Sequence, residues 1–199
     1  MGVRVHLFGG SGSGTTTLGQ AIAAALAIPH RDTDDFYWYP TDPPFAHPRE
    51  PGQRLQLLDE ALAKSRSWVL SGSLCGWGDP LITGFTHAVF LHVEPAIREA
   101  RLLTRERQRY GSRIDAGGDL FDHHNEFMEW ARSYDKAGPP MRSRQLHESW
   151  QQGLSCPILR LDSSQPVPAL IDQVLLFVES AVDGSDVTGD GTEAATGTG

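Results

Sequence analysis

The sequence predicts an α/β fold in which a parallel sheet is covered by helices on both faces. Two observations support this prediction. Short apolar runs bounded by glycine, proline or polar residues alternate along the chain with longer amphipathic stretches. Strands that alternate with helices in this way form parallel sheets whose faces are buried under the connecting helices. The 199 residues, of which 39% are hydrophobic, suffice for one compact core, and we expect one domain over residues 1–182.

Five apolar runs are expected to be strands, at residues 3–8, 28–33, 68–71, 88–93 and 157–161. The intervening patterns predict helices at residues 16–26, 53–65, 79–83, 95–109, 121–134, 144–154 and 167–182. An aromatic and proline-rich segment, residues 36–51, is expected to be a loop over a site. Residues 183–199 are rich in Gly, Thr, Ser and Asp and lack apolar residues to bury, so this tail is predicted to be disordered.

Charge and composition restrict the classes of partner. The formal net charge is −8, and the tail holds four acidic residues and no Lys or Arg. Affinity for a phosphate backbone depends on Lys and Arg, so no nucleic-acid partner is expected. No apolar run approaches the roughly 20 residues of a membrane span, and no signal-peptide core precedes the first strand. Cys75 and Cys156 lack the spacing of a disulfide framework or a zinc site. We therefore expect a cytoplasmic protein without a membrane partner, either monomeric or homodimeric.

A glycine-rich segment lies between the first expected strand and the first expected helix, and it reads Gly9-Gly10-Ser11-Gly12-Ser13-Gly14-Thr15-Thr16. Its spacing is that of a Walker A phosphate-binding loop, GxxxxG[K][ST], in the required context. Small residues let successive backbone N–H groups point inward, and the helix N-terminus adds a partial positive charge, so both favour a polyphosphate. Thr16 would then offer its hydroxyl to Mg²⁺. The alternative is a flexible glycine turn before a helix.

The loop departs from the motif at one position, where Thr15 replaces the lysine that reaches the β- and γ-phosphates. Neutral hydroxyls can still hold a nucleotide. Phosphoryl transfer, however, depends mainly on electrostatic stabilisation, so the transferring group would need another cation. The substitution therefore bears on catalysis more than on binding.

At this point the sequence resembles the P-loop small-molecule kinases of the adenylate, shikimate and gluconate kinase group, over about residues 3–180. The resemblance implies a three-layer P-loop NTPase fold with a five-stranded parallel sheet in the order 2-3-1-4-5 and a helical lid at about residues 110–120. It also implies Mg²⁺ and ATP, with γ-phosphate transfer to a small acceptor, for which a nucleoside monophosphate is the first candidate. The missing lysine leaves a non-catalytic nucleotide-binding sensor or regulator as the alternative. The expected nucleotide-binding residues are Gly9, Gly10, Ser11, Gly12, Ser13, Gly14, Thr15, Thr16 and Thr17.

Two acids at the end of the second expected strand, in the segment Asp32-Thr33-Asp34, resemble the DxD of shikimate and gluconate kinases. The resemblance implies that Asp32 joins Thr16 in holding Mg²⁺, through water, and that Asp34 orients or deprotonates the acceptor hydroxyl. Parallel sheets bind ligands at the carboxyl ends of their strands, where both acids are expected beside the phosphate loop. The alternative is that these aspartates cap a helix or form a turn.

Arginines recur along the helix expected at residues 95–109 with spacings of three, four and four, which places them on one face. Like charges at such spacings repel, so a phosphate partner would explain the arrangement. This face resembles the arginine-bearing kinase lid, in which an arginine would replace the missing lysine. The alternative is a solvated face balanced by Glu94, Glu99 and Glu106. The face comprises Arg98, Arg101, Arg105 and Arg109, and the resemblance implies catalytic roles for Arg105, Arg109 and Arg113.

Three weaker patterns leave the interpretation open or favour no site. The segment Ser71-Gly72-Ser73 would line the acceptor pocket, unless it is only a tight turn. Arg142 and Arg144 are either a second phosphate-facing pair or exposed surface residues. The pair His123-His124 and the single His147 have no metal-ligand pattern, and we expect them at hydrated helix positions.

Overall fold

The structure, a computed structural model, describes residues 2–183, so most of the tail predicted to be disordered lies outside the described residues. The strands are β1 (Arg4–Gly9), β2 (His30–Asp32), β3 (Trp68–Ser71), β4 (His87–His92) and β5 (Ile158–Asp162). The helices are α1 (Thr15–Ala25), α2 (Thr33–Tyr37), α3 (Pro51–Ala63), α4 (Pro95–Tyr110), α5 (Phe121–Ser133), α6 (Arg144–Trp150) and α7 (Val167–Asp183). Short 3-10 turns lie at Asp79–Gly84, Gly111–Ile114 and Gln151–Gly153. Within the described residues, no helix is both long and apolar enough to cross a membrane.

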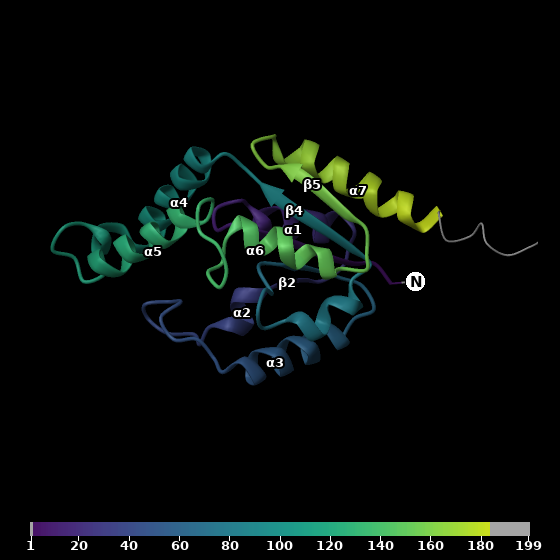
Figure 1. Cartoon of the computed structure of the whole chain (residues 1–199), viewed down its shortest axis with the longest axis horizontal. Coiled ribbons are helices and arrows are strands. Elements are labelled where there is room, and N and C mark those ends of the chain that lie inside the picture. The colour runs from purple at the N-terminus through teal and green to yellow at the C-terminus, as the bar shows by residue number, and fades with distance from the viewer. Residues whose placement is uncertain (1, 184–199) are drawn as a thin grey trace, which may run out of the picture.

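The five strands form one parallel sheet in the order β2-β3-β1-β4-β5, which confirms the predicted fold class (Figure 1). In the register, Ser71 of β3 lies opposite both Leu7 of β1 and Asp32 of β2. The carboxyl ends of these three strands therefore lie side by side. Because β1 continues into the phosphate loop, the end of β2 is brought to the same edge of the sheet as that loop.

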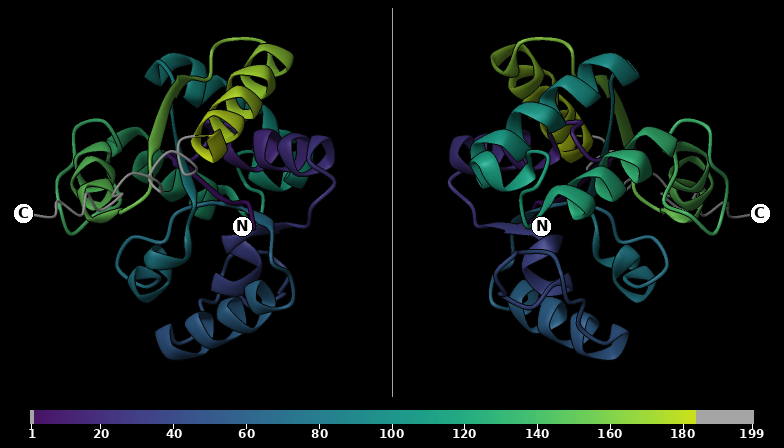
Figure 2. Two further views of the ribbon diagram at one scale, coloured as in Figure 1. Left: turned by 90° about the vertical axis from the view of Figure 1, so that its right-hand side faces the viewer. Right: turned by 90° about the vertical axis from the view of Figure 1, so that its left-hand side faces the viewer.

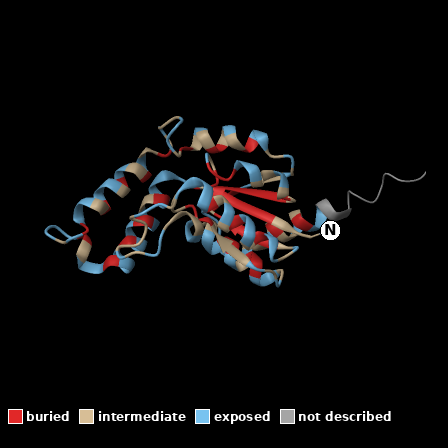
Figure 3. Ribbon diagram, turned by 90° about the horizontal axis from the view of Figure 1, so that it is seen from below, coloured by how far each residue is buried: buried red, intermediate tan, exposed pale blue. Residues whose placement is uncertain are grey.

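Helices cover both faces of the sheet, which gives three layers (Figure 2). On one face, α1 and α7 bury an aliphatic core that includes Leu18, Ile22 and Val174. On the other face, α3 and α6 pack over a more aromatic core that includes Leu58, Phe8 and the half-buried Trp150. Figure 3 shows the strands as the most continuously buried part of the chain, as expected for a sheet covered on both sides.

The helices α4 and α5 form a hairpin that projects beyond the sheet (Figure 1). Leu102, Met128 and Ala131 are buried between the two helices near the sheet. Tyr110, Ile114 and Leu120 form a smaller apolar cluster at the far end. The segment for which the resemblance implies a lid, residues 110–120, forms this far end and connects the two helices.

The end of the second strand differs from the prediction. The strand β2 stops at Asp32, and the chain turns at once into the short helix α2, where we expected strand to Thr33 and loop from Phe36. The Asp32 side chain explains the turn, because its Oδ1 accepts the Asp34 N–H at 3.0 Å and caps the helix. An aspartate at this position thus ends the strand and begins the helix.

Candidate active site

The phosphate loop leaves β1 at Gly9 and enters α1 at Thr15. Gly12 and Gly14 have φ angles of +85° and +92°, in the left-handed region that residues with side chains rarely adopt. Space is the constraint at Gly10, because a Cβ there would lie 2.8 Å from a ring carbon of Tyr134. The glycines of the motif therefore serve two purposes, to allow the curvature of the loop and to admit the tyrosine ring behind it.

The start of α1 and Ser13 offer hydrogen-bond donors that have no protein partner among residues 2–183. The first N–H groups of an α-helix have no acceptor within the helix, and Gly14, the residue before α1, has no side chain to cap them. The first turn of α1 carries no acid that would repel an anion. The Ser13 hydroxyl is 1% exposed and has no hydrogen-bond partner within residues 2–183. A polyphosphate fits this set of donors.

Thr16 and Asp32, the residues expected to hold magnesium, lie side by side. The Thr16 hydroxyl donates to Asp32 Oδ2 at 2.6 Å. Since a hydroxyl has a single hydrogen, this bond leaves the oxygen lone pairs of Thr16 for another partner. Mg²⁺ is commonly held by one or two oxygen side chains together with substrate phosphates, and this pair fits such a site. Asp32 also caps α2, so it has the capping role that was the alternative interpretation.

Ser71 and Ser73 do not form an acceptor pocket. Both are buried, with exposed fractions of 0% and 5%. Ser71 Oγ donates to Asp32 Oδ2 at 3.0 Å and lies 2.9 Å from His30 Nε2, whereas Ser73 Oγ lies 3.0 Å from His147 Nε2. Their hydroxyls are therefore engaged within the protein, and the alternative of a tight turn agrees with the positive φ of the intervening glycine.

Asp34 lies in the first turn of α2. The residue as a whole is exposed, but protein atoms crowd around its carboxylate. Desolvation by the surrounding protein, and then the negative charge of Asp32, raise the pKa of Asp34. The positive charges of Arg142 and Arg105 oppose this shift in pKa. The site thus holds a carboxylate with raised proton affinity and two arginines near enough to act on its charge. Of the two arginines we left open, Arg142 is the one that acts on this site.

The arginines of α4 do not converge on one partner, so this part of the prediction is wrong. Arg98 is 3% exposed and bonds to the chain behind the phosphate loop. Arg101 donates to the Ser163 carbonyl at 2.8 Å and to its hydroxyl at 3.3 Å, beside the end of β5. Both arginines are on the predicted helix, but their side chains bond to different segments, Arg98 to α5 and Arg101 to the segment after β5.

The three arginines with implied catalytic roles also differ from one another. Arg105 has no hydrogen bond or ion pair with any residue between 2 and 183, and its guanidinium lies 6.0 Å from the Phe127 ring centre. Arg109 lies over the ring of Phe45 at 4.7 Å and 3.7 Å from Glu106. Arg113 is paired with Asp119 at 2.7 Å and Asp42 at 3.1 Å. Arg105 is therefore the one of these three whose charge the described residues leave without an acidic partner.

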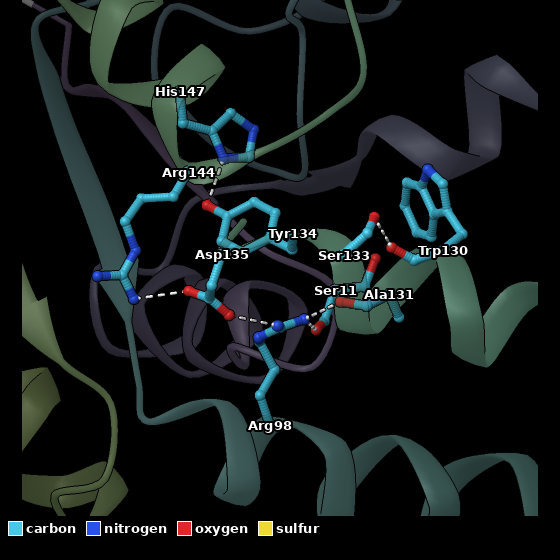
Figure 4. A network of polar contacts seen from close by, with 9 residues as sticks. All are labelled: Ser11, Arg98, Trp130, Ala131, Ser133, Tyr134, Asp135, Arg144 and His147. Carbon is cyan, nitrogen blue, oxygen red and sulfur yellow. Dashed lines mark hydrogen bonds and ion pairs between the residues drawn. The ribbon is translucent and has the colours of Figure 1, made fainter. Parts of the chain in front are cut away.

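A polar network centred on the buried Arg98 lies against the phosphate loop, and no sequence pattern pointed to it (Figure 4). Arg98 donates to the Ala131 carbonyl at 2.8 Å and more weakly to the Ser11 carbonyl at 3.4 Å. Its other terminal nitrogen pairs with Asp135 at 2.7 Å, and the second oxygen of Asp135 accepts from Arg144 at 2.7 Å. The end of α5 is thereby fastened to the phosphate loop. Arg144 belongs to this network and is not part of a phosphate-facing pair.

Histidines in the helices are more buried than predicted. His147 is 0% exposed, and its Nδ1 lies 2.8 Å from the Tyr134 hydroxyl. Burial lowers the pKa of His147 to about 3, so the ring is neutral at physiological pH. His124 is 9% exposed and lies 3.6 Å from Glu106. The expectation of hydrated positions is wrong for both, because α6 and α5 turn these residues toward the protein interior.

A cavity of about 220 Å³ opens beside the phosphate loop. Its lining comes from the loop and α1, from Arg101 of α4 and from the segment after β5. Ligand pockets usually measure about 300–1,000 Å³, so this space suits one part of a nucleotide whose phosphates extend onto the loop. The lining residues nearest the loop are Ser13, Gly14 and Thr17, and those after β5 are Ser163, Gln165 and Val167.

Sequence comparison places the chain in a family. It is 43% identical over 176 residues to the uncharacterized protein YqaC of Bacillus subtilis (strain 168), and the match covers 88% of this chain and 97% of YqaC. The chain belongs to the YqaC family. No family model matches it.

Solved structures with a similar fold include a shikimate kinase and a gluconokinase. A shikimate kinase from Bacteroides thetaiotaomicron superposes with a TM-score of 0.57 at 18% identity, over 89% of this chain and 98% of the kinase. A gluconokinase from Sinorhizobium meliloti 1021 gives 0.53 at 20% identity, over 92% and 94% of the two chains. This member of the YqaC family therefore has the fold of these kinases.

Proposed function

We propose that this YqaC-family protein is a magnesium-dependent phosphotransferase, which moves the γ-phosphate of ATP to a small hydroxylated or phosphorylated acceptor. The observation that carries the proposal is the 2.6 Å hydrogen bond between Thr16 and Asp32 at the mouth of an uncapped, glycine-built loop. It joins a potential metal ligand to an acid beside a site suited to phosphate. A glycine turn without a ligand would not require this pairing.

The residues divide the proposed work among them. The backbone N–H groups from Gly10 to Thr16 would hold the β-phosphate, except that of Ser13, which donates to the Gly10 carbonyl at 2.9 Å. The nucleoside would lie toward the cavity beside Arg101. Thr16 would bind magnesium directly and Asp32 would do so through water, and the ion would supply charge neutralisation between the phosphates. Thr17 lines the cavity next to the loop and would also contact the nucleotide there.

Asp34 and Arg105 would serve the transfer itself. Asp34 would accept the proton of the acceptor hydroxyl as its oxygen bonds to the γ-phosphorus and the bond from that phosphorus to the bridging oxygen breaks, which releases ADP. Its raised pKa suits a base, provided that the carboxyl is ionised. Arg105 would stabilise charge on the transferring group and so replace the lysine absent at Thr15. Arg109 and Arg113 stay candidates for this role if the lid rearranges.

The acceptor is expected to be anionic or to carry several hydroxyl groups, because Arg105 and Arg142 both act on the charge of Asp34. A nucleoside monophosphate is the first acceptor to test. A sugar or a cyclic acid would meet the same arginines.

A second candidate function is a nucleotide-binding sensor that does not transfer phosphate. Thr15 favours it, since the neutral side chain retains the cradle and removes the charge that normally contacts the γ-phosphate. Such a protein would bind magnesium-ATP and leave every acceptor unmodified.

The test follows ADP release from the purified protein with magnesium-ATP and a panel of nucleoside monophosphates, sugars and hydroxy acids. Thr16→Ala and Asp34→Asn are the site variants, and Thr104→Ala, an exposed position on α4, is the matched control. The proposal expects acceptor-dependent ADP release that Asp34→Asn lowers by roughly 100-fold or more, as for loss of a general base. Tight binding without turnover on any acceptor would favour the sensor instead.

A further inference from the structure

A line of hydrogen bonds continues inward from the proposed magnesium pair. Ser71 Oγ donates to Asp32 Oδ2 at 3.0 Å, and His30 Nε2 lies 2.9 Å from Ser71 Oγ. Because the single serine hydrogen is directed to the carboxylate, the bond between Ser71 and His30 requires the hydrogen on the imidazole nitrogen. The polarity of the line is thereby fixed, with His30 donating to Ser71 and Ser71 donating to Asp32.

The sheet itself sets up this line. His30 and Asp32 are two residues apart on β2, so their side chains leave the same face of the strand. Asp32 and Ser71 are register partners on adjacent parallel strands. The histidine and the carboxylate therefore both reach the one serine that lies beside them, which the strand pairing holds at 0% exposure.

The helix that starts at the phosphate loop leaves space for the imidazole. A Cβ added at Gly19 of α1 would lie 3.0 Å from His30 Nε2 and 3.2 Å from Ser71 Cβ. This glycine has a helical conformation, so curvature does not require it at this position. Its lack of a side chain is instead explained by the histidine and serine packed against it.

The bonds constrain the Asp32 carboxylate from both oxygens. Its Oδ2 accepts from Thr16 and from Ser71, and its Oδ1 accepts from the Asp34 N–H. We propose that His30 is a positioning residue, which acts through Ser71 to hold the Asp32 carboxylate in the orientation that receives Thr16. This inference rests on the proposed function, because it assigns His30 to the support of the magnesium site. Outer partners of metal-binding groups typically change metal affinity by about 10–100-fold when they are removed.

The test measures ATP affinity by calorimetry, with magnesium and with a chelator, on the full chain. For His30→Ala we expect the gain in ATP affinity that magnesium provides to fall by about 10-fold or more, with affinity in chelator unchanged. Ser71→Ala should give the same loss. His30→Gln retains an N–H donor of similar reach and should recover most of the gain. His123→Gln, on α5 and away from the site, is the matched control and should behave as the wild type.

A double-mutant cycle separates positioning from a general effect on folding. If His30 acts through Ser71, adding His30→Ala to Ser71→Ala should cause no further loss of the magnesium effect. Additive losses in the cycle would overturn the inference, as would a His30→Ala protein that keeps the full magnesium effect. Circular dichroism identifies any variant that fails to fold, and His30→Gln and Ser71→Ala then decide the outcome. A wild-type protein without magnesium-dependent ATP affinity would overturn the proposed function itself, which is a different result from an unaffected His30→Ala.

Discussion

Two polar networks contact the phosphate loop and the start of α1. They differ in whether their hydrogen-bonding groups stay free for a ligand. In front, Thr16 and Ser71 both donate to Asp32, and Thr16 keeps oxygen lone pairs for another partner. Behind, Arg98 is buried and engaged with two carbonyls and Asp135 (Figure 4). A charged residue near a phosphate loop is therefore not necessarily part of a site. A residue of the site keeps donors or acceptors that a ligand can use, whereas the donors of a structural residue are bound within the protein.

The largest expected effect separates the two aspartates. Asp135→Asn should lower the free energy of unfolding by about 3 kcal/mol or more, because it leaves the buried Arg98 charge without its partner. Asp32→Asn should cost only about 1 kcal/mol, because asparagine keeps the oxygen that caps α2 and loses only the acceptor of Thr16 and Ser71, while the change removes the magnesium dependence of ATP binding. Urea denaturation measures both. Equal losses of stability would contradict the division into a structural and a functional network.

The second test compares arginines within α4. Arg105→Ala should lower kcat by roughly 100-fold, the usual effect of removing one group that stabilises charge in the transition state. Its matched control is Arg107→Ala, since Arg107 pairs with the exposed Asp115 at 2.7 Å. The control should keep wild-type kinetics. Equal activity of the two variants would show that Arg105 does not replace the missing lysine. Arg142 would then be the next residue to change.

The third test uses the neutral histidine of the rear network. Folding lowers the pKa of His147 from 6.5 to about 3, so below pH 6.5 the unfolded chain binds a proton that the folded chain does not. The contribution of neutral His147 to the free energy of unfolding is fully present above pH 6.5. It falls as the pH drops toward 3, by about 1.4 kcal/mol per pH unit. His147→Gln should remove that part of the slope, measured by denaturation at pH 7.5 and 5.5. An unchanged slope in His147→Gln would contradict the assignment.

The smallest effect is expected where residues 110–120 meet the aromatic and proline-rich segment, residues 36–51. Arg113 pairs with Asp42 across this contact, and both side chains are exposed. Asp42→Ala should leave the thermal midpoint essentially unchanged, because exposed ion pairs contribute little to stability. Asp119→Ala, which removes the other partner of Arg113, provides the comparison. A clear fall in the midpoint for Asp42→Ala alone would show that this contact fixes the loop.

The sequence predicted the sheet well because strands buried on both faces are continuous apolar runs that glycines and polar residues interrupt. It also brought Thr16 and Asp32 to one edge, since parallel strands end together. The short helix α2 was missed because its five residues have no room for a helical period. Its signal was the capping aspartate, which is also the residue expected to bind magnesium. In the structure this one side chain caps α2 and accepts a hydrogen bond from Thr16.

The arginines and histidines show where sequence reasoning stopped. Spacing places Arg98 and Arg105 on one face of α4. Only the tertiary structure brings the end of α5 into contact with Arg98 and leaves Arg105 without such a partner among the described residues. Nor did any local pattern predict the contact of Tyr134 with Gly10, which joins residues more than a hundred positions apart. His30 carried no motif, and its bond to Ser71 follows from a strand register that the sequence leaves undetermined.

The most direct test of the central claim is calorimetric titration of the wild-type protein with magnesium-ATP, alongside Thr16→Ala and the exposed control Thr104→Ala. The account predicts saturable binding by the wild type and the control, and a magnesium-dependent loss of affinity of about 10-fold in Thr16→Ala. Absence of binding by the wild type at millimolar magnesium-ATP would contradict the claim that this loop holds a nucleotide.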